Sequence, residues 1–425
     1  MESNTSKLKR IAILSIHTSP LHQPGFGDSG GMNVYITETA KRIADTGVAV
    51  EIFTRATATN NADVSELHPG VLVRHLPAGP FEGLRKEDLP AQLCAVTAGL
   101  LREEAAREVG FYDLIHSHYW LSGQVGWIAK ERWNIPLVHT MHTMALVKNR
   151  QLAVGDTAEP AVRIIGEQQV VEIADSLVAN TDQEANELID LYHADPARVH
   201  VINPGVDLKT FQPGSQLDAR SQLGIADDAV LLLFVGRIQP LKGPDVLLRA
   251  AQELIVRVPE LRHKLVVGIC GGPSGSGELQ PTYLNDLAND LGLSEIVRFI
   301  PPLNRDELVR WFQAATLTVV PSYSESFGLV ALESQACGTP VVATNVGGLR
   351  TTVLNRKSGL LVNGHNPSAW TDAILEVILD NEFLNQLRSG ARAHAENFDW
   401  ETTSNKLLNI YRQAIADSLS ASHQG

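Results

Sequence analysis

The segment VGRIQPLKG, residues 235–243, carries side chains suited to a phosphorylated ligand. It follows an apolar run of strand length, and it offers the planar donor fork of Arg237 and the point charge of Lys242. Glycine at positions 236 and 243 leaves room for a ligand near the backbone. Two such cations bind a pyrophosphate well, so the segment predicts a diphosphate site; the alternative is a loop with two solvated cations.

A second segment, ESFGLVALE, places two carboxylates, Glu325 and Glu333, eight positions apart. A helix beginning near Phe327 would direct free amides toward phosphates and carry Glu333 about two turns from its start. Carboxylates accept hydrogen bonds from pairs of hydroxyls, so this pair suits a ribose or a sugar. Acid–base catalysis by the pair is a rival role, and an ordinary glutamate on a helix surface is the simplest alternative.

A glycine-rich loop near the N-terminus is the third candidate. GFGDSG, residues 25–30, satisfies the pattern GxGxxG. A dinucleotide fingerprint directly follows its strand and is matched by an acidic residue ending the second strand. Here eight residues separate Ile16, at the end of the first predicted strand, from Gly25. The second predicted strand ends in Thr54-Arg55, neither of which is acidic. The loop therefore favours close approach of a ligand, with the Gly30–Asn33 turn opening a helix whose amides suit an anion; an ordinary glycine turn is the alternative.

Histidines cluster near the ends of predicted strands. His116 and His118 lie two apart in an extended run and would share a face, while His139 and His142 flank the end of another strand. The chain has no HExxH and no cysteine beside these residues, so zinc is disfavoured. Neutral hydrogen bonding at a cleft is favoured, especially for His17 and His142.

The elements that would position these residues form two series. Short β-branched runs alternate with amphipathic stretches, the pattern of parallel sheets wrapped by helices. The first series has predicted strands at 10–16, 49–54, 71–75, 114–116, 137–139, 176–179 and 199–202, with helices at 32–46, 92–109 and 161–174. After a break at 203–207 and a polar stretch to 228, the second has strands at 230–235, 265–269, 297–299, 317–320, 341–343 and 360–362, with helices at 244–256, 305–314, 329–335 and 367–380.

Two series of strands predict two doubly wound α/β domains facing each other across a ligand cleft, rather than one large sheet. We expect residues 1–206 to form the first domain and residues 207–399 the second. A helix at 400–425 is expected to pack back on the first domain.

Composition excludes several other classes of protein. The 425 residues are 44% hydrophobic and 20% charged with a net charge of -13, a globular balance that makes nucleic acid a poor partner. The three cysteines lack CxxC spacing, which argues against a disulfide framework. No apolar run approaches the roughly 18 residues needed to cross a bilayer, so we expect a cytoplasmic protein without a membrane partner.

Together these segments resemble the retaining glycosyltransferases of family 4, which have the GT-B fold. VGRIQPLKG and PSYSESFGLVALESQACGTPVVATNVGG carry the donor-side likeness. HTSPLHQPGFGDSGGMNVY, PAGPFEGLRKEDLP, DLIHSHYWLSGQVGW and HTMHTMALVKN narrow it to members that act on inositol 3-phosphate in mycothiol biosynthesis. The likeness runs from about Arg10 to Tyr411.

The resemblance implies retaining transfer of N-acetylglucosamine from UDP-GlcNAc to 1D-myo-inositol 3-phosphate. The implied acceptor-binding residues are His17, Asp28, Ser29, Gly30, Gly31, Met32, Asn33, Lys86, Tyr119, Thr143 and Arg163. The implied donor-binding residues are Gln23, Pro24, Gly31, Arg237, Lys242, Leu303, Glu325 and Glu333. Arg237 and Lys242 would stabilise the leaving diphosphate, and His142 would contact the sugar as the third catalytic residue.

The family chemistry requires no cofactor. The resemblance also implies a homodimer and a structural Mg²⁺ held by main-chain oxygens of Phe312, Gln313, Ala315 and Thr339. Three alternatives remain open: a related glycosyltransferase with another sugar-phosphate or inositol-lipid acceptor, a nicotinamide oxidoreductase using GxGxxG, and a sugar-nucleotide sensor without catalysis.

Overall fold

The computed structural model describes residues 8–25, 27–153, 156–272 and 282–422, and within them it contains two sheets. The first has eight strands in the order β3 (Val64–His68), β4 (Val71–Leu76), β2 (Ala49–Arg55), β1 (Arg10–Leu14), β5 (Leu114–His118), β6 (Leu137–Thr140), β7 (Ser176–Ala179) and β8 (Val199–Val201). The second has six in the order β11 (Val297–Ile300), β10 (Leu265–Cys270), β9 (Val230–Val235), β12 (Leu317–Val320), β13 (Val341–Thr344) and β14 (Gly359–Val362). The predicted pair of doubly wound α/β domains is confirmed, and the single large sheet is wrong.

Helices follow most strands in both domains. Those packed with the first sheet are α1 (Gly31–Asp45), η1 (Lys86–Gln92), α2 (Leu93–Ala105), α3 (Trp120–Trp133), α4 (Ala145–Asn149), α5 (Ala161–Ile173), α6 (Asp182–Tyr192), η2 (Pro196–Arg198) and α15 (Trp400–Ser422). Those of the second domain are α7 (Gln216–Leu223), η3 (Pro240–Lys242), α8 (Pro244–Arg257), η4 (Pro259–His263), α9 (Tyr283–Asp290), α10 (Arg305–Ala314), α11 (Leu329–Ala336), α12 (Leu349–Thr352), α13 (Pro367–Ile378) and α14 (Asn381–Ala395).

The central strands β1 and β9 are apolar, apart from Arg10 at the start of β1, because helices cover both of their faces. In β1, Ile11 and Ile13 join the core formed with α1 and α15, while Ala12 and Leu14 join the core formed with α2 and α3. The strand β9 alternates in the same way between α8 and α13 on one face and α10 and α11 on the other. Parallel strands buried on two faces read as continuous apolar runs, which is why the sequence pattern located them.

The edge strand β3 is absent from the prediction. Its sequence, VSELH, is mostly polar, and its side chains are exposed or half-buried. It pairs antiparallel with β4, with a register shift between Glu66 and His68, whereas the other paired strands are parallel. A short, polar, irregular edge strand has no apolar alternation by which sequence could reveal it.

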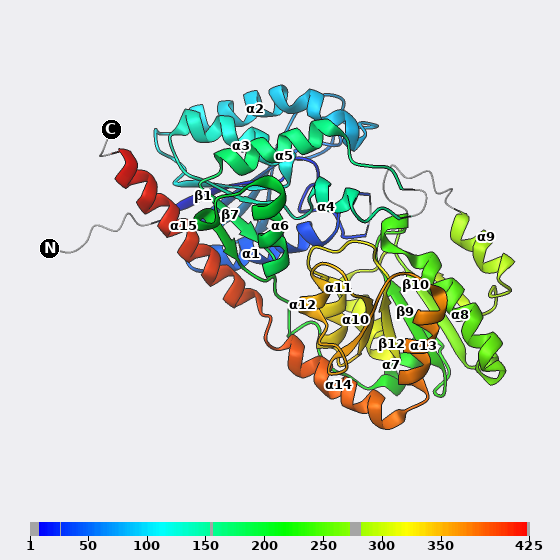
Figure 1. Ribbon diagram of the computed structural model, residues 1–425. Helices are drawn as coiled ribbons and strands as arrows, with labels where there is room; N and C mark the ends of the chain where they lie inside the picture. The colour runs from blue at the N-terminus through cyan, green and yellow to red at the C-terminus, as the bar shows by residue number, and fades with distance from the viewer. Residues whose placement is uncertain (1–7, 26, 154–155, 273–281, 423–425) are drawn as a thin grey trace.

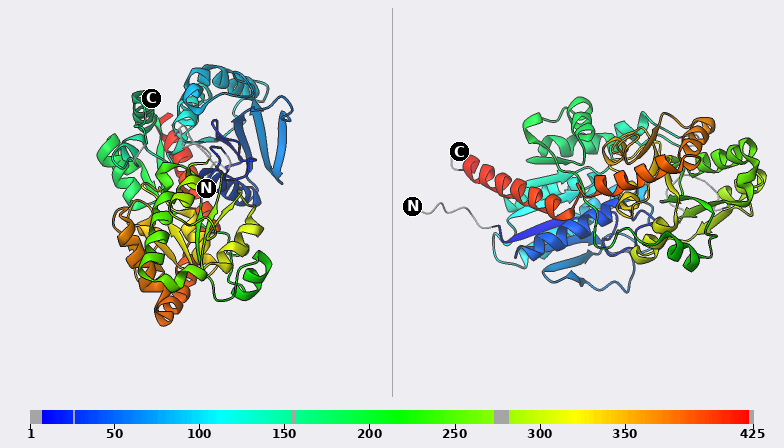
Figure 2. Two further views of the ribbon diagram at one scale, coloured as in Figure 1. Left: turned by 90° about the vertical axis from the view of Figure 1, so that its right-hand side faces the viewer. Right: turned by 90° about the horizontal axis from the view of Figure 1, so that it is seen from below.

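The chain crosses between the domains at two adjacent places (Figure 1). After α14 on the second domain it returns to the first as α15, and Figure 2 shows these two helices running one after the other along the molecule. The Val206 amide donates to the Phe398 carbonyl at 3.1 Å, which joins the two crossings. A Cβ at Gly205 would lie 2.3 Å from the Trp400 nitrogen, so this close approach requires glycine.

Within the described part of the chain, no helix is both long enough and apolar enough to cross a membrane. Cys94 is exposed, Cys270 and Cys337 are buried, and all three are free thiols.

Candidate active site

A cleft of about 480 Å³ lies between the two domains. His17, Tyr119 and His142 line it from the loops that follow β1, β5 and β6. Gly236 and Ser322 line it from the loops that follow β9 and β12 in the second domain. Both walls are therefore built at the carboxyl ends of parallel strands, where doubly wound sheets bind ligands.

The second domain supplies two cations, each near a carboxylate. Arg237 Nη1 lies 3.8 Å from Asp28 Oδ1 of the opposite domain, and Lys242 Nζ lies 2.5 Å from Glu325 Oε2. Lys242 ends η3, and Gly243, with φ of 64°, turns the chain into α8. The two predicted cations thus share one cleft with Asp28 and Glu325. A bound diphosphate would compete with these two carboxylates for the cations.

Glu333 lies on α11, which begins at Leu329 and confirms the helix predicted over 329–335. Gly328, with a φ of 100°, precedes the helix and leaves Phe327 outside it. Burial raises the pKa of Glu333 to about 7, and the nearby Glu38 carboxylate adds to this, while Arg305 opposes it. A carboxyl group in this environment suits hydrogen bonding to the hydroxyls of a bound sugar or ribose.

Arg305 and Glu38 form an ion pair across the cleft, with Arg305 Nη1 at 2.7 Å from Glu38 Oε1. Glu38 is 4% exposed on α1 and Arg305 is the first residue of α10. Arg305 also lines the cleft. Neither residue is recognisable from the sequence, because no local pattern joins positions this far apart in the chain.

Replacing Glu333 with glutamine should make stability less sensitive to pH. The folded pKa of about 7 exceeds the ordinary value of 4.5, so the folded state keeps a proton that the unfolded state releases. Stability is therefore lost as pH rises from about 4.5 to 7. Glu333→Gln should be more stable than the parent at pH 8 by on the order of 2 kcal/mol, and no more stable at pH 4.5. Urea denaturation at both pH values measures this.

The exposed Glu382→Gln serves as the control, because it makes the same change on the surface of the second domain. An equal effect of Glu333→Gln at pH 4.5 and pH 8 would contradict a buried carboxyl with a raised pKa.

The glycine-rich loop divides into residues that line the cleft and residues that hold the loop. Asp28, Gly30, Gly31 and Met32 line the cleft, as do Gln23 and Pro24 just before them. The Asn33 side chain instead donates to the Ser19 carbonyl at 2.7 Å and accepts from the Gly30 amide at 3.1 Å. Ser29 Oγ donates to the His22 carbonyl at 3.1 Å. Asn33 and Ser29 are buried behind the wall, so the structure places neither where the acceptor prediction needs it. Phe26 lies outside the described residues.

The end of β2 argues against the dinucleotide alternative for this loop. Where an acidic residue would be required, the strand ends in Arg55, which is buried and donates from Nη1 to the Pro80 carbonyl at 2.8 Å. A dinucleotide-binding domain would need a carboxylate there to bind the ribose.

Tyr119 is at the centre of the first domain's wall. Its φ of 69° is a left-handed conformation that is rare for an aromatic residue. Lys86 Nζ lies 4.8 Å from the centroid of its ring, and the Arg163 guanidinium lies 5.0 Å away. The His17 ring is 4.4 Å from it. Four of the residues implied to bind the acceptor, Tyr119, Lys86, Arg163 and His17, therefore meet at one place although they come from separate segments.

Two of these residues differ in access to the cleft. Lys86 lines the cleft, and no ion pair joins it to a carboxylate among the residues that the structure describes. Arg163 does not line it: its side chain is 3% exposed and lies behind Thr143, whose Oγ1 accepts from Arg163 Nη2 at 2.8 Å. A direct contact between Arg163 and the acceptor would require Thr143 to share that guanidinium.

The histidines lie together as neutral rings. His118 Nδ1 and His142 Nε2 are 2.8 Å apart, and the rings of His116 and His118 are 4.1 Å apart, which confirms that they share a face. Burial lowers the pKa of His142 to about 3 and, assisted by Lys86, lowers that of His17 well below its ordinary value. His142 also accepts, through its carbonyl, a hydrogen bond from the Ser326 hydroxyl of the second domain.

The main-chain oxygens considered for magnesium lie outside the cleft. Thr339 Oγ1 donates to the Phe312 carbonyl at 2.6 Å, so these two segments are in contact. Gln216 Nε2 donates to the Ala315 carbonyl at 2.8 Å. The Phe312 carbonyl also accepts from the Ala315 amide at 3.2 Å, so both of its lone pairs are engaged, whereas the Ala315 carbonyl keeps a second lone pair that could bind a hard cation. In the described residues, no group of three or more histidines, cysteines and carboxylates is placed to bind a metal.

Comparison with known proteins gives consistent matches along the chain. Residues 30–205 match the family described as Glycosyl transferase 4-like domain, and residues 215–394 match Glycosyl transferases group 1. D-inositol 3-phosphate glycosyltransferase 2 of Catenulispora acidiphila is 59% identical over 409 residues, covering 96% of each chain. The D-inositol 3-phosphate glycosyltransferase of Thermobispora bispora is 58% identical over 415 residues, covering 98% of this chain and 97% of that protein.

Solved structures agree with this fold. Sucrose-phosphate synthase from Thermosynechococcus elongatus superposes with a TM-score of 0.89 at 31% identity, covering 96% of this chain and 100% of that one. Anabaena HepE in complex with UDP and glucose gives a TM-score of 0.73 at 22% identity, over 97% of this chain and 100% of that one. The second likeness concerns the fold alone.

Proposed function

This chain belongs to the family of the D-inositol 3-phosphate glycosyltransferases, as its resemblance predicted, and on that premise we propose that it transfers N-acetylglucosamine from UDP-GlcNAc to 1D-myo-inositol 3-phosphate. The observation that carries the proposal is that cationic side chains line both walls of one cleft. Arg237 and Lys242 line the second domain's wall, and Lys86 lines the first domain's wall beside Tyr119. Such a cleft suits a donor diphosphate opposite an acceptor phosphate.

In this proposal the attack and the departure occur on the same face of the sugar. The bond between the anomeric carbon and the diphosphate oxygen breaks, the acceptor oxygen bonds to that carbon, and the departing phosphate takes the acceptor's proton. Arg237 and Lys242 balance the negative charge that develops on the diphosphate. Glu325 and Glu333 accept hydrogen bonds from the sugar and from the uridine ribose, and Leu303 lies beside the base.

The remaining cleft residues position the donor and exclude water. His142 is neutral, so it acts as a hydrogen-bonding contact to the sugar rather than as a cation. The Gln23 amide and the Pro302 carbonyl, 3.5 Å apart, connect the loop of the first domain to the second. Closure of the walls would keep water from hydrolysing the donor.

The proposed reaction is tested by incubating the purified protein with UDP-GlcNAc, with and without inositol 3-phosphate. We expect UDP release that depends on the acceptor, and a product whose anomeric proton coupling in NMR reports the α configuration of the donor. Binding of UDP-GlcNAc without consumption would support a sensor instead. A β linkage would overturn the retaining mechanism while leaving the family membership intact.

Three further points belong to the proposal. Mg²⁺ at the main-chain oxygens of Phe312, Gln313, Ala315 and Thr339 would be structural, so chelation should lower the melting temperature without abolishing turnover. Loss of turnover on chelation, reversed by Mg²⁺, would contradict this role.

We also propose a homodimer, to be tested by light scattering, and a cytoplasmic location, to be tested by cell fractionation.

A further inference from the structure

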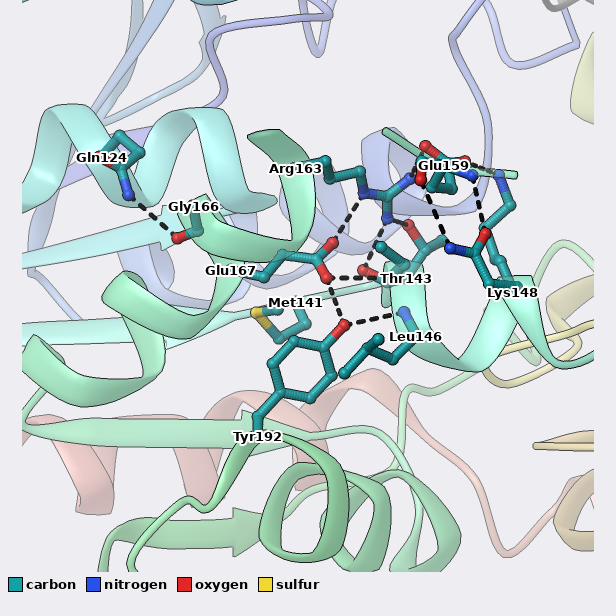
Figure 3. A network of polar contacts seen from close by, with 12 residues as sticks. Gln124, Met141, Thr143, Leu146, Lys148, Glu159, Arg163, Gly166, Glu167 and Tyr192 are labelled. Carbon is teal, nitrogen blue, oxygen red and sulfur yellow. Dashed lines mark hydrogen bonds and ion pairs between the residues drawn. The ribbon is translucent and has the colours of Figure 1, made fainter. Parts of the chain in front are cut away.

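A buried charge network lies behind the first domain's wall of the cleft (Figure 3). It joins Lys148 of α4, Glu159 just before α5, and Arg163 and Glu167 of α5. Arg163 Nη1 is 2.8 Å from Glu159 Oε2, and Arg163 Nε is 2.7 Å from Glu167 Oε1. The guanidinium is therefore held between two carboxylates before any ligand binds.

Glu167 is the fully buried carboxylate of this network. It is 0% exposed, and its Oε2 accepts from the Ala145 amide at 2.9 Å and from the Tyr192 hydroxyl at 2.5 Å. Tyr192 in turn accepts from the Leu146 amide at 3.0 Å. One carboxylate thus fixes both the start of α4 and the guanidinium of Arg163.

The segment held in this way reaches the cleft. Thr143, two residues before Ala145, lines the cleft, and Arg163 Nη2 donates to its hydroxyl at 2.8 Å and to its carbonyl at 3.2 Å. The preceding residue, His142, accepts from Ser326 of the second domain. The segment 142–146, which leads into α4, is therefore anchored from behind by Glu167 and contacts the second domain in front.

The charge of Glu167 has a specific purpose in this arrangement. A buried carboxylate is tolerated only when donors satisfy it, and here three donors converge on it. Glutamine has nearly the same shape, but its NH2 group would face either the Arg163 N–H or the Ala145 N–H, placing a donor against a donor. In either orientation the substitution would weaken the link between the guanidinium and the start of α4.

We propose that Glu167 is a positioning residue for acceptor recognition, which holds Arg163 and the segment 142–146 in the arrangement that binds the acceptor's phosphate. This inference rests on the proposed function, because it takes the acceptor to bind beside Thr143 and Lys86. Tyr192 supports the same arrangement through Leu146 and Glu167.

The test is steady-state kinetics of full-length Glu167→Gln with inositol 3-phosphate and with free inositol. The KM for inositol 3-phosphate should rise at least tenfold, and the ratio of kcat/KM for the phosphate over free inositol should fall by a similar factor. The Kd of UDP, measured by calorimetry, should change less than twofold. Tyr192→Phe leaves the pair between Glu167 and Arg163 intact, so it should shift the same ratio by a smaller factor.

Glu172→Gln, exposed on the same helix, is the matched control and should leave all three quantities unchanged. An unchanged KM and ratio in Glu167→Gln would overturn the inference, as would an equal loss with both acceptors, which would indicate a merely structural role. Absence of turnover with inositol 3-phosphate in the parent protein would instead contradict the proposed function, so the two failures are distinguishable.

Discussion

Alanine at Arg237 or at Lys242 should lower kcat by roughly a hundredfold, or about 3 kcal/mol of transition-state stabilisation. Charge develops on the diphosphate as the glycosidic bond breaks, and each of these cations lines the cleft at that wall. Each lies near a carboxylate, Asp28 or Glu325, so its removal also leaves that carboxylate without its counter-charge. Pre-steady-state measurement of sugar transfer under saturating substrates determines the effect on the chemical step.

Lys264→Ala provides the control for this experiment. Lys264 forms a surface ion pair with Asp228 and does not line the cleft, so its removal should leave kcat within twofold of the parent. A near-normal kcat in both Arg237→Ala and Lys242→Ala would show that neither cation stabilises the transition state.

The second large effect concerns the acceptor. Inositol 3-phosphate should exceed free inositol in kcat/KM by roughly a hundredfold or more, because a charge-assisted hydrogen bond contributes about 1.5–3 kcal/mol and several would be lost together. The charge of Arg163 is already balanced by Glu159 and Glu167, so Lys86 supplies the excess positive charge at this wall. Lys86→Ala should therefore raise the acceptor KM at least tenfold while leaving the Kd of UDP nearly unchanged.

The neighbouring Arg85→Ala is a matched control, since Arg85 is exposed and paired with Asp88. It removes the same charge one residue away and should leave the acceptor KM unchanged. Equal use of inositol and inositol 3-phosphate by the parent protein would contradict the acceptor assignment and leave a glycosyltransferase with an unknown acceptor.

The fold was predictable where burial imposes a local pattern. The run over 230–235 matches β9, and the helix predicted over 305–314 matches α10, because apolar residues on buried faces recur at fixed intervals. The strand β3 escaped prediction because its partner covers only one edge and its side chains meet solvent. The helix predicted over 329–335 is confirmed by α11, which Gly328 precedes with a φ of 100°.

The candidate site was predictable where its residues are close in sequence. Arg237 and Lys242 lie within one loop, and the structure places both at the cleft. Asn33 was expected at the acceptor, but an amide can equally satisfy its own loop, and its bonds to Ser19 and Gly30 depend on a fold of that loop that the sequence does not encode locally. The pair of Arg305 with Glu38 joins residues 267 positions apart, and no spacing rule reaches that far.

The helix α15 has a consequence for the order in which the protein is completed. Trp400, Leu407 and Tyr411 are buried in the core that α1 and the first strands also form. During synthesis, the first domain therefore emerges from the ribosome with part of one face of its core uncovered. It stays so until the whole second domain has followed. The second domain can bury its own cores before the first domain does, because their residues all precede α15. A chaperone that shields apolar surface would therefore bind the first domain.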